Sequence, residues 1–282
     1  MGERMTNSAI PTLTKNIITS QPVVIPVFHE VAVRLLHMMN SSFYEIEEVI
    51  TLVQKDPALA SEMLRHANSA FYSGKVPITT IKDAIIRLGS QQIVNLAFTA
   101  SMSTSRSNNP AISAYMKKLW LHCCAVAKTS SCLALKIGSE KGIPDLNHDE
   151  VYLAGLLHDI GKLYLLKVID RLMVSDIIHP GTSLIEEILD ELNIQQGIKV
   201  MKHYNMPEIY SDLLDRLVKE QWQSGSNDYF VAAVRLADKM HSRGEDGIAG
   251  AELVEVDDIC DEMSFLGVED VSYLQELAKA IN

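Results

Sequence analysis

Apolar residues recur along this chain at the three- and four-residue spacing of amphipathic α-helices, and this pattern constrains the fold more than any other feature. Phe28, Val31 and Leu35 follow that spacing after Pro26, a good first-turn residue. Alternating β-branched runs hardly occur, and only the segment 22–26, between two prolines, is expected to be extended. We therefore predict an all-α fold, a multi-helix bundle made of two helical halves.

Start and stop signals divide the first half into short helices. We expect a helix over 44–55, a second opened by Asp56-Pro57, and a third capped by Thr80 and ended by Gly89. Another helix is expected over 91–102. These signals predict a first subdomain of closely spaced helices.

A polar segment, 101–110, is poor in helix-forming residues and is the best candidate for an internal boundary. We predict an N-terminal helical subdomain over 1–105 and a second helical subdomain over 106–282. The second should begin with a long helix over 111–138, and a loop over 142–147 should follow it.

A helix carrying His158 and Asp159 is expected next, with Gly161-Lys162 ending it. Three or four further helices should fill the remainder. The sequence shows no repeat of fixed period, so a solenoid is not expected. The expected helix breaks lie at residues rich in turn formers: Gly181, Met206-Pro207, Gly225 and Gly244.

The composition excludes several classes of protein. The 282 residues carry a formal net charge of −11, which disfavours binding to nucleic acid, and no polybasic cluster indicates a membrane surface. The chain has no run of about 18 apolar residues, so no membrane span is expected, and the N-terminus lacks the apolar core of a signal peptide. The four cysteines form no C-x-x-C pair, so we expect free thiols in a cytoplasmic protein.

The segment 156–166 carries an adjacent histidine and aspartate, His158 and Asp159, in apolar surroundings. Imidazole nitrogen and carboxylate oxygen together suit a divalent transition metal. His122 and Asp238 also stand in apolar helical stretches, where a solvated face is not expected. These four residues could hold one divalent ion from separate helices.

Each of these residues also has a structural interpretation. His122 could be a core histidine bonded to a carbonyl group, and Asp238 could pair with Arg235 or cap a neighbouring helix. Lys162 could neutralise a phosphate oxygen, or it could be a solvated lysine at the end of a helix. The adjacent pair at 158 and 159 is harder to explain as packing.

The order of these residues resembles a known family pattern. A histidine, a His-Asp dyad and a later aspartate resemble the HD superfamily of metal-dependent phosphohydrolases, over about residues 111–243. Segments of the first half resemble HDOD domains more specifically, as do two later tracts. These segments are Asp56–Leu59, Leu64–Ala70, Ile81–Gly89, Leu119–His122 and Tyr204–Pro207.

The first-half motifs themselves are expected to be architectural, with Asn68-Ser69 forming a turn whose side chains bond backbone groups. His66 is most simply a surface or core histidine. No cluster of titratable residues accompanies these motifs, so they do not indicate a ligand site.

The chain departs from relatives that bind two metals. It lacks the Gly-Tyr-Pro motif of HD-GYP proteins, which cleave cyclic di-GMP, and Asn193 stands where HDOD relatives often have histidine. Where HDOD relatives often have two adjacent histidines, this chain has Leu217-Val218-Lys219 at or near that place. Ligands for a second metal are therefore missing, which disfavours a two-metal mechanism. Four residues could substitute for the missing ligands, although each is most simply a structural or exposed residue: His179, His203, Glu186 and Glu187.

The resemblance implies a bacterial signal-transduction module that acts mainly through contacts with a signalling protein and has a single-metal site. The alternative is an active phosphohydrolase on a nucleotide or other phosphate ester, with Asp159 and Lys162 in catalysis. The metal ligands would be His122, His158, Asp159 and Asp238, and Fe, Mn, Zn, Ni or Mg could occupy the site.

Overall fold

The computed structural model describes residues 9–20, 23, 27–41, 43–72, 76–141, 146–218, 226–241, 256–268 and 270–281. Every regular element in these residues is an α-helix, so the prediction of an all-α fold is confirmed. None of these helices is both long and apolar enough to cross a membrane. The helices are α1 (Ala9–Ser20), α2 (Glu30–Met39), α3 (Ile46–Val53), α4 (Pro57–Ala67), α5 (Ile81–Leu88), α6 (Ser90–Ser103), α7 (Pro110–Lys141), α8 (His148–Leu157), α9 (Ile160–Val174), α10 (Thr182–His203), α11 (Glu208–Leu217), α12 (Ser226–His241), α13 (Val256–Leu266) and α14 (Val271–Ile281).

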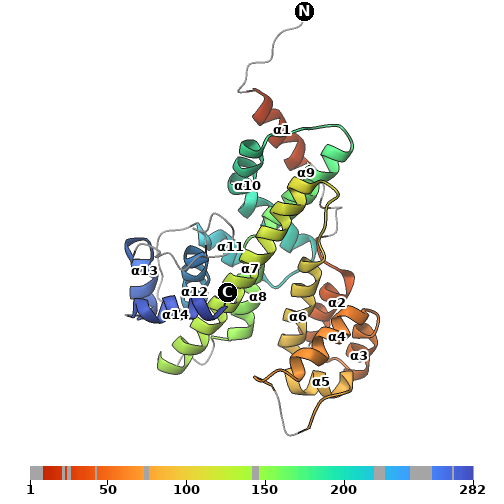
Figure 1. The fold of residues 1–282 in the computed structure, drawn as a ribbon, viewed down its shortest axis with the longest axis vertical. Coiled ribbons are helices and arrows are strands. Elements are labelled where there is room, and N and C mark those ends of the chain that lie inside the picture. Colours follow the sequence, from red (N-terminus) through yellow and green to blue (C-terminus); the bar gives the residue numbers. More distant parts are fainter. Residues whose placement is uncertain are drawn as a thin grey trace, which may run out of the picture.

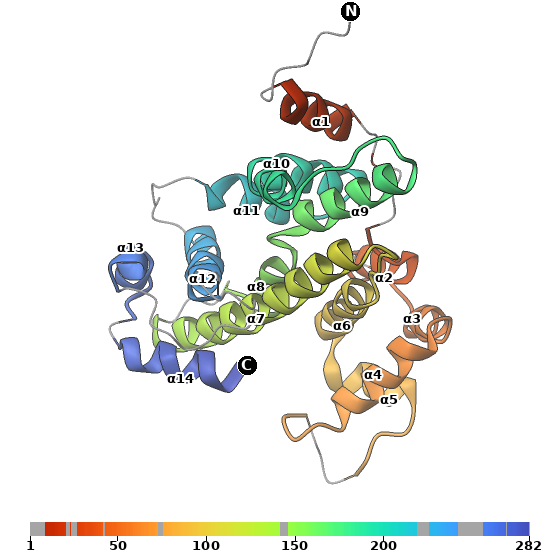
Figure 2. The ribbon, with the colours of Figure 1, turned by 45° about the horizontal axis from the view of Figure 1, so that its top comes forward.

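The long helix α7 forms the spine of the molecule (Figures 1 and 2). Helices α2 to α6 cluster on one side of it, and α9 to α14 lie on the other sides. Helix α7 contacts α6, α8, α9, α12 and α14 directly. Side chains from distant parts of the sequence can therefore meet along its length.

Local capping explains the short helices of the first half. The Asp56 carboxylate accepts hydrogen bonds from the backbone N–H groups of Ala58 and Leu59 at 3.1 and 3.0 Å, as expected for an N-cap. The Thr80 hydroxyl caps α5 in the same way. Gly89 ends α5 at a φ of +80°, a conformation that favours glycine. The signals read from the sequence are confirmed here.

Asn68 fixes the connection between α4 and α5. Its carboxamide donates to the carbonyl oxygens of Leu64 and Ile78 and accepts from the Ile78 N–H, with all three distances at 2.8 Å. The prediction that this side chain would bond backbone groups is therefore confirmed, and the Asn68 carboxamide holds the two ends of the loop together.

Helix α1 packs against α9 and α10 rather than against the other first-half helices. Lys15 Nζ lies 2.6 Å from a carboxylate oxygen of Glu187 and 2.6 Å from one of Glu191, both on α10. The division into subdomains 1–105 and 106–282 stays a prediction, and α1 is one element of the first that contacts the second.

The predicted helix through His158 and Asp159 was wrong in its boundaries. Helix α8 ends at Leu157, and α9 begins at Ile160, so the two residues form the junction. Asp159 leaves the helical region of backbone space, with φ −109° and ψ 22°. Gly161 and Lys162 begin α9 instead of ending a helix.

A close approach between helices explains why glycine stands in the first turn of α9. A Cβ atom at Gly161 would lie 1.9 Å from the carbonyl oxygen of Asn193 on α10. The glycine therefore permits contact between α9 and α10, a role that its helix-breaking tendency concealed in the sequence.

Other boundaries also moved. Helix α2 begins at Glu30 and leaves Phe28 outside, and α3 is shorter than predicted at both ends. Five helices follow α9 in the described residues, more than the three or four expected, because residues 256–281 form two. Most of the segment 22–26, part of the 142–147 loop, and the breaks near Gly225 and Gly244 lie outside the described residues.

Candidate metal centre

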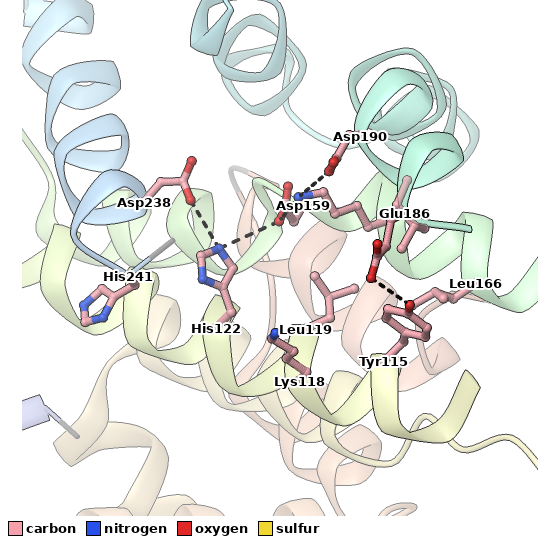
Figure 3. A pocket seen from close by; sticks show the side chains of 12 residues that line it. Tyr115, Lys118, Leu119, His122, Asp159, Leu166, Glu186, Asp190, Asp238 and His241 are labelled. Atoms are coloured by element: carbon pink, nitrogen blue, oxygen red, sulfur yellow. Dashed lines mark hydrogen bonds and ion pairs between the residues drawn. The ribbon is translucent and has the colours of Figure 1, made fainter. Parts of the chain in front are cut away.

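Three side chains from separate parts of the chain converge beside α7, and Figure 3 draws two of them, His122 and Asp238. His122 comes from α7, His158 directly follows α8, and Asp238 comes from α12. His122 Nε2 lies 3.1 Å from His158 Nε2 and 3.2 Å from Asp238 Oδ1. His158 Nε2 lies 3.5 Å from the same carboxylate oxygen. The three ligand atoms thus form a compact triangle.

This triangle has the dimensions of a metal site. Two ligand atoms at about 2.1 Å from a tetrahedral ion lie about 3.4 Å from each other. The three separations at the site, 3.1, 3.2 and 3.5 Å, are close to that value. Two imidazoles and one carboxylate leave a fourth position for another ligand. The residues present therefore fit a single divalent ion.

The second ring nitrogen of His158 fixes its orientation. Nδ1 lies 2.7 Å from the carbonyl oxygen of Gly155, so it donates its proton there, and in the neutral ring the Nε2 lone pair faces the site. Gly155 itself allows α8 to approach α7, since a Cβ there would lie 2.8 Å from the Ala127 Cα. A packing requirement thereby holds the candidate ligand in place.

Neighbouring carboxylates control the charge of His158. Burial disfavours the imidazolium, but Asp159 and Asp238 together outweigh burial and raise the pKa of His158 to about 9. Burial also disfavours the charged form of Asp238, but its hydrogen bonds with His122 and His158 outweigh that effect and hold the pKa of Asp238 well below its usual value. The site thus attracts a cation, whether a proton or a metal ion.

Asp159 lies beside this triangle but is engaged elsewhere. Its Oδ2 atom lies 2.9 Å from Lys162 Nζ, and its Oδ1 accepts a hydrogen bond of 2.6 Å from Asn193 Nδ2. Oδ2 also lies 3.7 Å from His122 Nε2 and 3.5 Å from His158 Nε2. Burial opposes ionisation, yet His158 and then Lys162 lower the pKa of Asp159. Oδ2 is thus about as close to the imidazoles as Asp238 Oδ1 is, and the place of Asp159 in the ligand set stays a prediction.

Lys162 is not the solvated lysine that was one interpretation of the sequence. It pairs with Asp159 and lies 3.8 Å from a carboxylate oxygen of Asp190 on α10. Burial disfavours its charge, but the Asp159 carboxylate dominates the remaining influences and the pKa of Lys162 is raised. Its ammonium therefore stays positive beside the site.

Ion pairs between helices fix the position of α12. Glu262 on α13 is fully buried and contacts Arg235 at 3.1 Å and Lys239 at 2.8 Å. Arg216 on α11 pairs with Asp228 near the start of α12. Arg235 thus has a carboxylate partner on α13, while Asp238 turns towards the two imidazoles.

A cavity of about 480 Å³ opens beside the candidate ligands. Tyr115 and Glu186 close one side of it through a hydrogen bond of 3.0 Å (Figure 3). Lys118 and Lys162 bring positive charge to its lining, and four carboxylates bring negative charge: Asp159, Glu186, Asp190 and Asp238. Its size and mixed charge suit a small polar ligand.

Residues 25–217 match the family model described as the HDOD domain, and these residues make up more than half of the chain. This chain belongs to the HDOD domain family. A further match is an uncharacterised protein of Treponema pallidum (strain Nichols), 21% identical over 170 residues. That match covers 58% of this chain and 32% of the relative, so the chain spans about a third of its length.

Solved structures share the fold of this HDOD protein. A candidate metal-dependent phosphohydrolase of Shewanella amazonensis SB2B has a TM-score of 0.70 and 18% identity, with 97% of this chain and 98% of that chain covered. An HDOD domain protein of unknown function from Geobacter sulfurreducens has a TM-score of 0.61 and 22% identity, with 97% of each chain covered. The recognition of an HD-like helical fold is confirmed.

The HDOD structure separates the residues singled out in the sequence. Glu186 reaches the cavity, whereas Glu187 pairs with Lys15 away from it. His179 is mostly exposed and lies 2.6 Å from Asp176. His203 packs edge-on against Tyr204 at the end of α10. Neither histidine is among the residues that line the cavity.

Sequence reasoning missed several residues of the HDOD cavity. Tyr115 and Leu119 lie seven and three residues before His122, so their helical spacing could have placed them on the same face of α7. Asp190 gave no signal, because it stands in a polar stretch that is typical of a solvated face. His241 lines the same cavity from α12.

Proposed function

We propose that this HDOD protein is a regulatory module that holds one divalent ion and acts through contact with a signalling protein. The observation that carries the proposal is the engagement of both Asp159 oxygens, by Lys162 and by Asn193. With Asp159 occupied in this way, His122, His158 and Asp238 remain as the ligand set. Three ligands suit one ion, and a two-metal hydrolytic mechanism has no support in this geometry.

Exposed apolar side chains in the first half support a role in protein contacts. Phe43 is 93% exposed, Phe71 is 82% exposed and Ile86 is 65% exposed. Val76 is 68% exposed, and its carbonyl oxygen accepts a hydrogen bond from Arg87 on α5, which holds it beside the helix that carries Ile86. These exposed side chains are available for contact with another protein.

The cavity favours a second candidate function, hydrolysis of a phosphate ester. It places the Lys162 ammonium beside the ligand triangle, where it would bind a phosphate oxygen. A divalent ion would supply Lewis acidity at the same place. Tyr115 and Lys118 would then contact the remainder of a nucleotide or another phosphate ligand.

Metal content tests the ion site. We expect the purified protein to carry about one equivalent of a divalent ion such as iron, manganese, zinc, nickel or magnesium, measured by elemental analysis. His158→Ala and Asp238→Ala should lose it, whereas His179→Ala, a change at an exposed histidine, should keep it. Asp159→Asn should retain most of the ion. Wild-type protein that stays metal-free after incubation with each ion would refute the site.

Turnover distinguishes the two functions. The metal-loaded protein should not hydrolyse a panel of phosphomonoesters and phosphodiesters faster than its Asp159→Ala variant does. Hydrolysis by the wild type that disappears in both Asp159→Ala and Lys162→Gln would overturn the regulatory proposal and establish the hydrolase. Retention of the fold in both variants should be checked by circular dichroism.

A further inference from the structure

A second cavity, of about 600 Å³, lies where the first half meets the second. Helices α4 and α6 supply one wall, and α7 and α8 supply the other. Its volume falls within the range of small-molecule sites in proteins. None of its lining residues lines the cavity beside the candidate metal centre.

Two residues that line this cavity each bury a polar atom that has no hydrogen-bond partner among the described residues. Trp120 Nε1, a donor, and Asn95 Oδ1, an acceptor, each have none. Asn95 is only 1% exposed, and its amide nitrogen is already used, donating to the carbonyl oxygen of Asp149 at 3.1 Å. Burying unpaired polar atoms is costly, so a ligand that offers one acceptor and one donor would be stabilised here.

The charge of the cavity is opposite to that of the protein. Arg65 and Lys128 line it, and no acidic residue is among the described residues of its lining, although the chain as a whole carries −11. Arg65 also binds Glu62, but Lys128 makes no ion pair with any residue that the structure describes. Burial lowers the pKa of His66, so this histidine contributes polarity rather than charge near neutral pH. The cavity therefore favours an anion.

Aromatic and aliphatic groups supply the rest of the lining. Trp120 and Tyr152 lie there with Leu96 and Leu121. The Tyr152 hydroxyl is paired with Thr99 Oγ1 at 3.3 Å, so it makes no demand on a ligand. Flat aromatic ligands pack well against such side chains.

From this combination we infer that the cavity between the two halves is a binding site for a purine nucleotide. The base would pack among the aromatic groups, and its polar edge would bond Trp120 Nε1 and Asn95 Oδ1 once these side chains turn towards it. The phosphate would bind Arg65 and Lys128, since charge-assisted hydrogen bonds to phosphate are strong. Because both halves supply ligand contacts, the nucleotide would hold them in one arrangement.

The position of α7 connects this site to the metal centre. Leu119 and His122 lie on the side of α7 that lines the first cavity, whereas Trp120, Cys124 and Lys128, each four residues apart, line the second. The inference does not depend on the proposed metal site, since the two sites have no lining residue in common.

Fluorescence of Trp120 provides the test. The chain has two tryptophans, and Trp222→Phe leaves Trp120 as the single reporter. Full-length protein with this substitution is titrated with adenosine 5′-monophosphate and guanosine 5′-monophosphate in the presence of EDTA, with adenosine as the control that lacks phosphate. We expect saturable quenching by at least one nucleotide and binding of adenosine that is roughly tenfold weaker or less.

Charge-reversal variants locate the binding. Lys128→Glu should weaken nucleotide binding roughly tenfold or more, whereas Lys117→Glu, an equal change at an exposed site of the same helix, should alter it by less than about twofold. Lys162→Gln, which changes the cavity beside the candidate metal centre, should leave nucleotide binding unchanged. No saturable quenching at millimolar nucleotide, or equal affinity in the Lys128 and Lys117 variants, overturns the inference. Loss of binding in Lys162→Gln alone would also overturn it, by placing the nucleotide beside the metal centre.

Discussion

Asn193 bonds Asp159 and the first turn of α9 with a single carboxamide. Its Nδ2 atom donates to Asp159 Oδ1 at 2.6 Å, and its own Oδ1 atom accepts from the Lys162 N–H at 3.1 Å. The residue that departs from the family pattern therefore supports the His-Asp junction. It satisfies a buried carboxylate and a helix N-terminus at the same time.

Replacing that carboxamide should destabilise the protein. In Asn193→Ala a buried carboxylate oxygen loses its donor, so we expect the free energy of unfolding to fall by about 1–3 kcal/mol in urea denaturation. Gln195→Ala, at an exposed position of the same helix, is the matched control and should change it by less than about 0.5 kcal/mol. Equal effects at the two positions would argue against the role assigned to Asn193.

Gly161 should tolerate no side chain. The Cβ atom in Gly161→Ala would lie 1.9 Å from the backbone oxygen of Asn193, so α9 and α10 would have to separate. We expect a loss of about 3 kcal/mol or more of stability, measured by thermal or urea unfolding. Gly181→Ala is the control because nothing lies within 4 Å of its added Cβ. A Gly161→Ala variant as stable as Gly181→Ala would contradict the close helix contact.

His241 should make stability depend on pH. Burial, followed by the charge of His122, lowers the pKa of His241 to about 4. Its Nε2 shares a hydrogen bond of 2.7 Å with the buried Thr129 hydroxyl. The unfolded chain takes up a proton near pH 6.5 and the folded protein only near pH 4, so this contribution is lost as the pH falls between these values.

The test compares unfolding of metal-free protein at about pH 7 and about pH 5, where the His241 contribution should account for about 1–2 kcal/mol of lost stability. His241→Gln should therefore lose less stability than the wild type over that interval. His179→Gln changes an exposed histidine and should behave as the wild type does. If His241→Gln shows the same loss as the wild type, the buried neutral imidazole is not the cause.

The buried Glu262 should be needed for the attachment of α13 to α12. Glu262→Ala would remove the carboxylate that Arg235 and Lys239 both contact, and we expect a loss of about 3 kcal/mol. Asp261→Ala, at an exposed neighbouring position on α13, should have little effect. Limited proteolysis should cleave the Glu262 variant faster than the Asp261 variant between α12 and α13. Similar cleavage rates would show that the ion pairs do not hold α13.

The sequence by itself determined the helical class, the family and the identity of the candidate ligands. Helical spacing and local caps such as Asp56 and Thr80 depend on residues within one or two turns, so they can be read without a fold. His122 and Asp238 could be selected because polar groups are rare in apolar stretches. How they would be arranged in space could not be read from these patterns.

Only the tertiary structure decided how those residues are used. It broke the helix at His158 and Asp159 and set Gly161 against the Asn193 backbone, a contact that no local rule contains. It also placed the Asp159 oxygens against Lys162 and Asn193, 3 and 34 residues away. Both outcomes depend on contacts between helices, since the distance between two side chains on different helices is set by packing and not by their order in the chain.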